Sequence, residues 1–177
     1  TVPETDAQAE FVRGWPPIRA ARRAAALKPA KKSAIAGELR DRIRGMLLGL
    51  AASDALGHAI HGLPAGAWSD KTAMALCLAE SLVSRGGSDP ADQVERYQDW
   101  QRTGHWSSTG SCVGISAATS RALAAAQWSG NPYAGSHDPA HADAEPLARI
   151  GPAVAWYLDD PQKAIDAAVN AVRITHQ

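Results

Sequence analysis

The chain has 177 residues, 45% hydrophobic and 20% charged, which is enough for one ordinary folded domain. Lysine plus arginine and aspartate plus glutamate number 18 each, and no apolar run is long enough to cross a bilayer. The composition therefore gives no specific nucleic-acid signal and excludes a membrane-spanning protein. Two widely separated cysteines, Cys77 and Cys112, each in an apolar pattern typical of a helix, favour the cytoplasm or another reducing compartment.

Charge is distributed unevenly along the chain. Residues 1–45 hold ten basic and five acidic side chains, a net charge of +5, and the remaining residues carry −5. We expect residues 1–37 to be a basic, flexible leader. A targeting or delivery segment, a contact with an anionic surface, or an arm docked on the body are the alternatives. Residues 38–177 form the predicted domain.

The first half of that domain shows helical patterns. Beginning at Glu38, a run of large apolar residues recurs at spacings of three and four, which predicts one helix face that ends in a turn at Asp54–Gly57. A nearly continuous apolar run predicts a second, buried helix from Thr72 to Val83. Ser69 and Asp70, just before it, are good N-cap residues.

Further helices are expected in the second half. Asp89-Pro90 predicts the start of a helix that carries Val94, Tyr97 and Trp100 on one side. Residues 129–146 predict a long loop, and two helices are expected at about 147–158 and 161–174. Two further helix faces are predicted from their spacing: Ile115, Thr119, Ala122, Leu123 and Ala126, and Ile165, Ala168, Val169 and Val172. With no convincing strand, the sequence predicts an all-α orthogonal helical bundle.

Several segments occur in a characteristic order and spacing. They are Arg42–Gly57, Trp68–Thr72, Arg96–Trp100, Ser108–Cys112, Leu147–Pro152 and Thr175-His176. In this order they resemble the ADP-ribosylglycohydrolase family, whose members remove ADP-ribose from proteins or nucleotides. The resemblance implies an all-α fold and a binuclear magnesium or manganese site.

The resemblance also implies where functional residues lie. Ser69 and Asp70 match positions that hold metal in the family. Ligand-binding positions are expected to converge beside the start of the central helix: Asp54, Ser108, Thr109, Gly110 and Arg149. An ADP-ribose group, free or on a protein, is the ligand that this similarity implies.

The chain departs from the family pattern at several of these places. Lys71 stands where the family has a second metal-binding aspartate, and Gly114 replaces another aspartate. His61 stands near a usual acidic residue, and Ala144-Glu145 replaces an Asn-Gly pair. The family's second metal-binding segment would lie beyond Gln177, so we expect a truncated domain. No catalytic residue is assigned, and no cofactor is expected for this chain alone; Mg²⁺ or Mn²⁺ is expected if the family site is retained.

Structural roles are the alternatives for the same residues. Asp70 suits an N-cap, Asp54 a turn or cap, and the Ser108 loop a helix cap, although its hydroxyls and backbone N–H groups also suit a phosphate or ribose. Arg149 suits an ion pair with a buried carboxylate. Trp68, Trp100, Trp106 and Trp156 suit the core, or stacking on adenine.

The histidines form two pairs at spacings found in zinc sites, His58/His61 and His137/His141. Pro139 interrupts a helix through the second pair, and no cysteine or carboxylate completes a recognised zinc pattern. We expect these four to be surface histidines.

Two functions of different classes follow. The first is an ADP-ribosylglycohydrolase-like domain, catalytically impaired or a fragment, concerned with the removal or recognition of ADP-ribose on proteins. The second is a non-enzymatic interaction module that holds a protein partner with its helical scaffold and basic leader.

Overall fold

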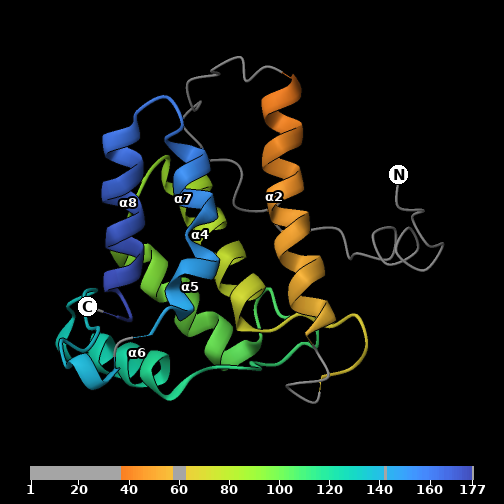
Figure 1. Ribbon diagram of the computed structural model, residues 1–177. Helices are drawn as coiled ribbons and strands as arrows, with labels where there is room; N and C mark the ends of the chain where they lie inside the picture. The colour runs from red at the N-terminus through yellow and green to blue at the C-terminus, as the bar shows by residue number, and fades with distance from the viewer. Residues whose placement is uncertain (1–36, 58–62, 142, 177) are drawn as a thin grey trace.

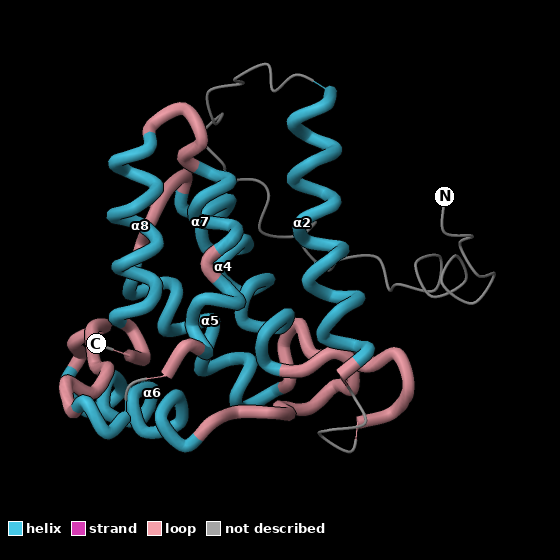
Figure 2. Tube along the Cα trace, viewed as in Figure 1, coloured by secondary structure: helices cyan, strands magenta, loops and turns pink. Residues whose placement is uncertain are grey.

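The computed structural model describes residues 37–57, 63–141 and 143–176. All regular elements in these ranges are helical, without a strand (Figures 1 and 2), which confirms the predicted all-α class. The elements are α2 (Gly37–Leu56), α4 (Asp70–Arg85), α5 (Pro90–Thr103), α6 (Ala117–Ser129), the 3-10 helices η3 (Pro139–His141) and η4 (Glu145–Arg149), α7 (Gly151–Trp156) and α8 (Pro161–Arg173). The predicted leader, His58 and His61 lie outside the described residues. None of the helices in the described ranges combines the length and hydropathy needed to cross a bilayer.

The central element is α4, which packs against α2, α5, α7 and η4. Its apolar run is buried nearly all round, as the sequence predicts, and the helix extends two residues beyond the predicted range at each end. Gly86 ends it in a left-handed conformation with φ of 73°, which glycine adopts without a steric penalty. Because α4 packs against α2, α5, α7 and η4, the residues at its first turn, from Asp70 on, lie among these elements.

Helix α2 covers one side of α4 and α7 (Figure 1). Its predicted apolar face is half-buried at Leu39, Ile43, Leu47 and Leu50. Met46 packs against Gly151 of α7, where an added Cβ would lie 3.0 Å from the Met46 sulfur. With α2 packed on α7 and α4, the C-terminal turn of α2 lies beside the first turn of α4.

Helices α5 and α6 complete the main core. The predicted α5 face is buried at Val94, Tyr97 and Trp100, and α6 contributes Leu123 and Ala126. Trp68 joins the same cluster, which confirms a core position for two of the tryptophans. Side-chain caps from Asp89 and Ser116 fix the first turns of these two helices.

The helix predicted over 147–158 is wrong as one element. The chain forms η4 up to Arg149 and then α7 from Gly151 to Trp156. Pro152, in the first turn of α7, explains the break, because it lacks the backbone N–H that a continuous helix would donate to the carbonyl of Ala148.

The predicted inward face of α8 is also wrong. The helix buries Ala164, Ala167 and Ala171, while Ile165 and Val169 are 57% and 50% exposed. Alanines allow α8 to approach α7 closely, and they pack against Leu78 and Leu82 of α4, so close packing determines which face of α8 turns inward.

Both cysteines are free, as expected for a chain without a disulfide framework. Cys77 is buried in α4. The helical pattern assigned to Cys112 is wrong, because Cys112 lies in the loop that precedes α6.

Candidate functional site

The first turn of α4 is capped by a carboxylate from another helix. Asp54 Oδ2 accepts hydrogen bonds from the backbone N–H groups of Ser69 and Thr72 at 3.0 and 3.1 Å. The hydroxyls of the same two residues donate to the Asp54 carboxylate at 2.6 and 2.7 Å. Ser69 occupies the N-cap position, but its side chain makes no capping bond to the helix. Asp54 therefore caps α4 across space, and two of the predicted site residues, Asp54 and Ser69, do lie together.

Asp70 is the most deeply buried carboxylate of this turn, at 1% exposure. Its Oδ2 pairs with Lys71 Nζ at 2.6 Å, whereas its Oδ1 has no hydrogen-bond partner in the described part of the chain. The pKa of Asp70 is raised, mainly because burial removes its carboxylate from water. The Lys71 ammonium opposes this rise, and the negative charge of Glu145 adds to it. Gly114 lies against the unpartnered oxygen, because an added Cβ there would be 2.7 Å from Oδ1.

A second polar group lies where η4 packs on α4. Arg149 is buried and its Nη1 lies 3.6 Å from Glu145 Oε1, which confirms the predicted ion pair. The guanidinium also donates to Thr175 Oγ1 and lies 5.6 Å from the centre of the Tyr97 ring. Thr119 of α6 donates to Glu145 at 3.1 Å. Arg149 thus joins η4, α5 and the segment after α8 in one network.

Unmet hydrogen-bonding capacity is concentrated around these two groups. Buried atoms without a partner in the described residues include Asp70 Oδ1, Arg149 Nε and His176 Nε2. Desolvation and the positive charge of Arg149 lower the pKa of His176, so its ring is neutral at pH 7. Because buried polar atoms are normally satisfied, these atoms mark a place suited to water or a polar ligand.

The predicted Ser108–Gly110 segment is only partly at the site. Ser108 Oγ accepts from the Trp68 N–H at 3.0 Å and donates to the Trp68 carbonyl at 2.9 Å, beside the start of α4. Thr109 and Gly110 are exposed, and the Thr109 hydroxyl bonds to Ser107 and Ser111. Ser108 is therefore held in place, while Thr109 and Gly110 face solvent.

Glu80 fixes the loop that carries Ser108. Its carboxylate pairs with Arg96 at 2.8 Å and binds His105 and the Trp106 indole N–H at 2.7 and 2.8 Å. Partial burial raises the pKa of Glu80, but these hydrogen bonds outweigh burial and lower it to about 2. Trp106 adopts a φ of 60°, an uncommon value for a non-glycine residue, which this network holds.

The donor set does not fit a divalent cation. Mg²⁺ takes six oxygen ligands, of which one or two are commonly carboxylates with an oxygen free to coordinate the ion. Here Asp54 is engaged as a cap, one Asp70 oxygen is paired with an ammonium, and no cluster of three His, Cys, Asp or Glu side chains suited to a metal occurs in the described part. The metal position implied for Ser69 and Asp70 therefore remains a prediction without a matching ligand shell.

His137 and His141 are exposed, as expected for surface histidines.

Sequence reasoning missed several residues of the site. Thr72 and Thr119 were predicted only as helix residues, whereas Glu145 stands four residues before Arg149, a spacing that predicts a helical ion pair. Nothing in the local sequence predicts that His176 would lie in the same network.

The sequence is similar to known proteins over the part of the chain that the structure describes. The model of the ADP-ribosylglycohydrolase family matches residues 36–177. The chain is 32% identical over 165 residues to the ADP-ribosylarginine hydrolase Tri1 of Pseudomonas putida (strain GB-1), covering 76% of this chain and 44% of that protein. It is 37% identical over 117 residues to the Tri1 of Serratia proteamaculans (strain 568), covering 53% of this chain and 32% of that protein.

The chain therefore spans less than half the length of these two curated relatives. The family match, in contrast, includes every element of the described structure, and the all-helical fold agrees with it. This chain belongs to the ADP-ribosylglycohydrolase family.

Proposed function

We propose that this chain is an ADP-ribosylglycohydrolase-type domain that recognises an ADP-ribosyl group on a protein and is impaired in hydrolysing it by itself. The observation that carries the proposal is the 2.6 Å ion pair between Lys71 Nζ and the buried Asp70 carboxylate. The names of the two relatives support ADP-ribosylated arginine as the first substrate to test.

Lys71 opposes a metal ion at Asp70. Two unit charges 4 Å apart interact by about 4 kcal/mol at the effective dielectric of a protein surface, and a divalent cation doubles this. Lys71 is 32% exposed and bonded to Asp70, so a cation at this carboxylate would have to displace the ammonium. Weak or absent binding of Mg²⁺ and Mn²⁺ follows, and hydrolysis that depends on such an ion is impaired.

The same arrangement tolerates an anion. An ammonium has three N–H donors, of which Asp70 takes one. The remaining donors lie at the N-terminal end of α4, where the helix dipole also favours negative charge. A phosphate of an ADP-ribosyl group, or an acidic side chain of a modified protein, suits this place.

Metal binding tests the first part of the proposal. Calorimetric titration with MgCl₂ and MnCl₂ should give no tight site in the unmodified chain. Lys71→Asp should improve binding only in part, because Asp54 is engaged as the cap of α4 and Glu145 as the partner of Arg149. Lys163→Asp is the matched control, since Lys163 forms a comparable 2.9 Å pair with Asp160 at the start of α8. Tight Mg²⁺ binding by the unmodified chain would overturn the role given to Lys71.

Substrate assays test the second part. An ADP-ribosylarginine peptide incubated with the chain and Mg²⁺ should release no more ADP-ribose than a blank. ADP-ribose itself should bind, and Lys71→Gln should weaken that binding several-fold while Lys163→Gln leaves it unchanged. Release that disappears in Asp70→Ala would refute the impairment, and absence of any ADP-ribose binding would refute recognition.

A further inference from the structure

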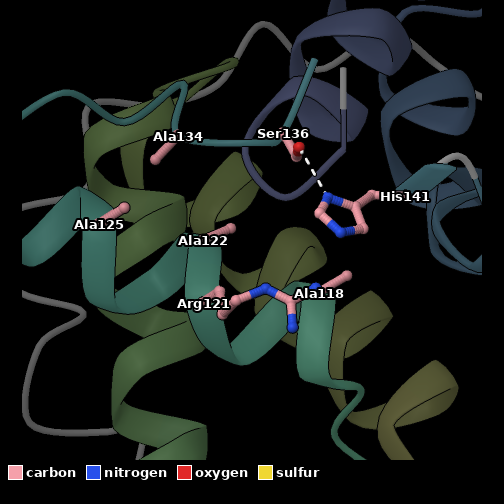
Figure 3. A pocket seen from close by; sticks show the side chains of 7 residues that line it. All are labelled: Ala118, Arg121, Ala122, Ala125, Ala134, Ser136 and His141. Atoms are coloured by element: carbon pink, nitrogen blue, oxygen red, sulfur yellow. Dashed lines mark hydrogen bonds between the residues drawn. The ribbon is translucent and has the colours of Figure 1, made fainter. Parts of the chain in front are cut away.

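A hollow lies between α6 and the segment that leads to η3. It has a volume of about 280 Å³ (Figure 3). Four alanines form its apolar lining, and Arg121, Ser136 and His141 supply the polar groups. None of these residues belongs to the networks at Asp70 or Glu145. Thr119, the α6 residue that bonds Glu145, is buried, whereas Arg121 is exposed.

The wall of the hollow opposite α6 is anchored to the end of α8. Ser136 forms a parallel bridge with His176, and the Gly135 N–H donates to the Arg173 carbonyl at 3.3 Å. An added Cβ at Gly135 would lie 2.5 Å from the His176 nitrogen, so the two backbones are in direct contact. Ser136 is thereby placed before any ligand arrives, which lowers the entropic cost of binding.

The hydrogen bonds of Ser136 orient the His141 ring. Ser136 Oγ accepts from the Asp138 N–H at 3.2 Å and lies 3.0 Å from His141 Nδ1. In the tautomer in which Nδ1 accepts the Ser136 hydroxyl proton, the ring N–H is carried by Nε2 and is free to donate to a ligand. Figure 3 shows this second nitrogen on the side of the hollow where the Arg121 side chain lies.

Arg121 supplies a positive charge that no carboxylate of the described residues pairs with. It forms no ion pair with any described residue, in contrast to Arg96, Arg102 and Arg149. In the chain segment opposite, Asp138 and Asp143 each use one carboxylate oxygen to accept a backbone N–H, from Ala140 and Glu145 respectively. The hollow thus presents a guanidinium and an imidazole N–H and has no acidic side chain in its lining.

We propose that this hollow binds the phosphate group of a small molecule. A guanidinium donates two parallel hydrogen bonds to a phosphate, and the imidazole N–H adds a third donor. The alanine lining gives contact to the group that carries the phosphate without competing for its oxygens. The phosphate comes either from a free phosphate or monoester, or from the diphosphate of an ADP-ribosyl group.

The test uses the 177-residue chain and inorganic phosphate, followed by ³¹P NMR line broadening. Arg121→Gln should weaken binding about tenfold or more, as expected for the loss of charge-assisted hydrogen bonds. His141→Ala should weaken it several-fold, and Ser136→Ala less. Arg102→Gln is the control, because it removes one exposed arginine charge on α5 away from the hollow. Thermal melts confirm that each variant is folded.

Competition identifies the source of the phosphate. If saturating ADP-ribose displaces inorganic phosphate, and Arg121→Gln weakens ADP-ribose binding equally, the group belongs to an ADP-ribosyl ligand. If ADP-ribose leaves phosphate binding unchanged, the site serves a separate phosphate or monoester. Absence of phosphate binding, or equal binding by the Arg121→Gln variant and the control, overturns the proposal. Lys163→Gln should not alter phosphate binding, since Lys163 pairs with Asp160 away from the hollow. The effect of Arg121→Gln on inorganic phosphate is measured without ADP-ribose, so failure here is distinguishable from failure of the proposed function.

Discussion

Asp54 and Thr72 join two helices at a single carboxylate oxygen. Asp54 Oδ2, in the last turn of α2, accepts both the backbone N–H of Thr72 at 3.1 Å and its hydroxyl at 2.7 Å. Since α2 has no fully buried residue, this contact contributes much of what orients α2 on α4. It also fixes the position of Ser69 and Thr72, at the first turn of α4, relative to α2.

Removing this cap should destabilise the protein. Asp54→Ala leaves two backbone N–H groups and two hydroxyls without their acceptor, at an expected cost of about 2–3 kcal/mol in the free energy of unfolding. Asp41→Ala on the same helix removes only an exposed 3.6 Å pair with Arg44 and should change it by less than about 0.5 kcal/mol. Urea unfolding of both variants would measure the difference, and equal effects would contradict the cap.

Gly114 should tolerate a side chain poorly, because of Asp70. Gly114 and Gly130 both have positive φ, 78° and 69°, so alanine at either position has a similar backbone cost of about 1 kcal/mol. Only at Gly114 does the new Cβ meet a neighbour, 2.7 Å from Asp70 Oδ1, while nothing lies within 4 Å at Gly130. We expect Gly114→Ala to lower the unfolding free energy by at least about 1 kcal/mol more than Gly130→Ala. Similar losses in a urea titration would show that the Asp70 carboxylate moves aside.

Glu80 should make stability dependent on pH in the acid range. Its folded-state pKa of about 2 lies below the ordinary 4.5, so the carboxylate contributes stability above pH 4.5, which is lost as pH falls towards 2. Glu80→Gln should therefore cost about 2 kcal/mol at pH 7, and the difference from the unmodified chain should shrink between pH 4.5 and 2. Glu95→Gln, at an exposed position of α5, is the control. A pH-independent difference between Glu80→Gln and the unmodified chain would exclude this linkage.

Arg149 should be the most sensitive residue of the second polar group. Arg149→Met leaves Glu145 buried without its counter-charge and should lower the unfolding free energy by about 3–5 kcal/mol. The double variant Arg149→Met/Glu145→Gln should recover part of this loss, because the unpaired charge is gone. Arg102→Met, which breaks only the exposed pair with Asp99, should cost less than about 1 kcal/mol. Calorimetric melts of the three variants provide the measurement, and a double variant no more stable than Arg149→Met would argue against the ion pair.

The fold was largely predictable where periodicity alone determines it. Helices α4 and α5 follow from an apolar run and from a face that carries Tyr97 and Trp100. The inward face of α8 could not be predicted from hydrophobicity, because the small Ala167 is buried while the larger Ile165 is exposed. Close contact between helices favours the smaller side chain at the interface. The division of residues 145–156 into η4 and α7 was signalled by Pro152 but not predicted.

The candidate site was less predictable than the fold. The resemblance brought Asp54, Ser69 and Asp70 to one place, and the structure agrees. It could not show that Asp54 acts as a cap or that Lys71 turns onto Asp70, since both depend on side-chain geometry. Likewise, the position of His176 beside Arg149 depends on how the chain returns after α8.

The inward-facing alanines of α8 determine how the protein responds to a larger side chain at these positions. An alanine side chain ends at Cβ and has no rotamer by which it can yield to a larger neighbour. A bulkier residue at Ala167 or Ala171 would therefore push the whole helix away from α4 and α7. Thr175 and His176 follow directly after α8 and would move with it, away from Arg149 and from the bridge at Ser136. A larger side chain at either alanine would thus displace α8 as a rigid body and disturb both the Arg149 network and the bridge at Ser136.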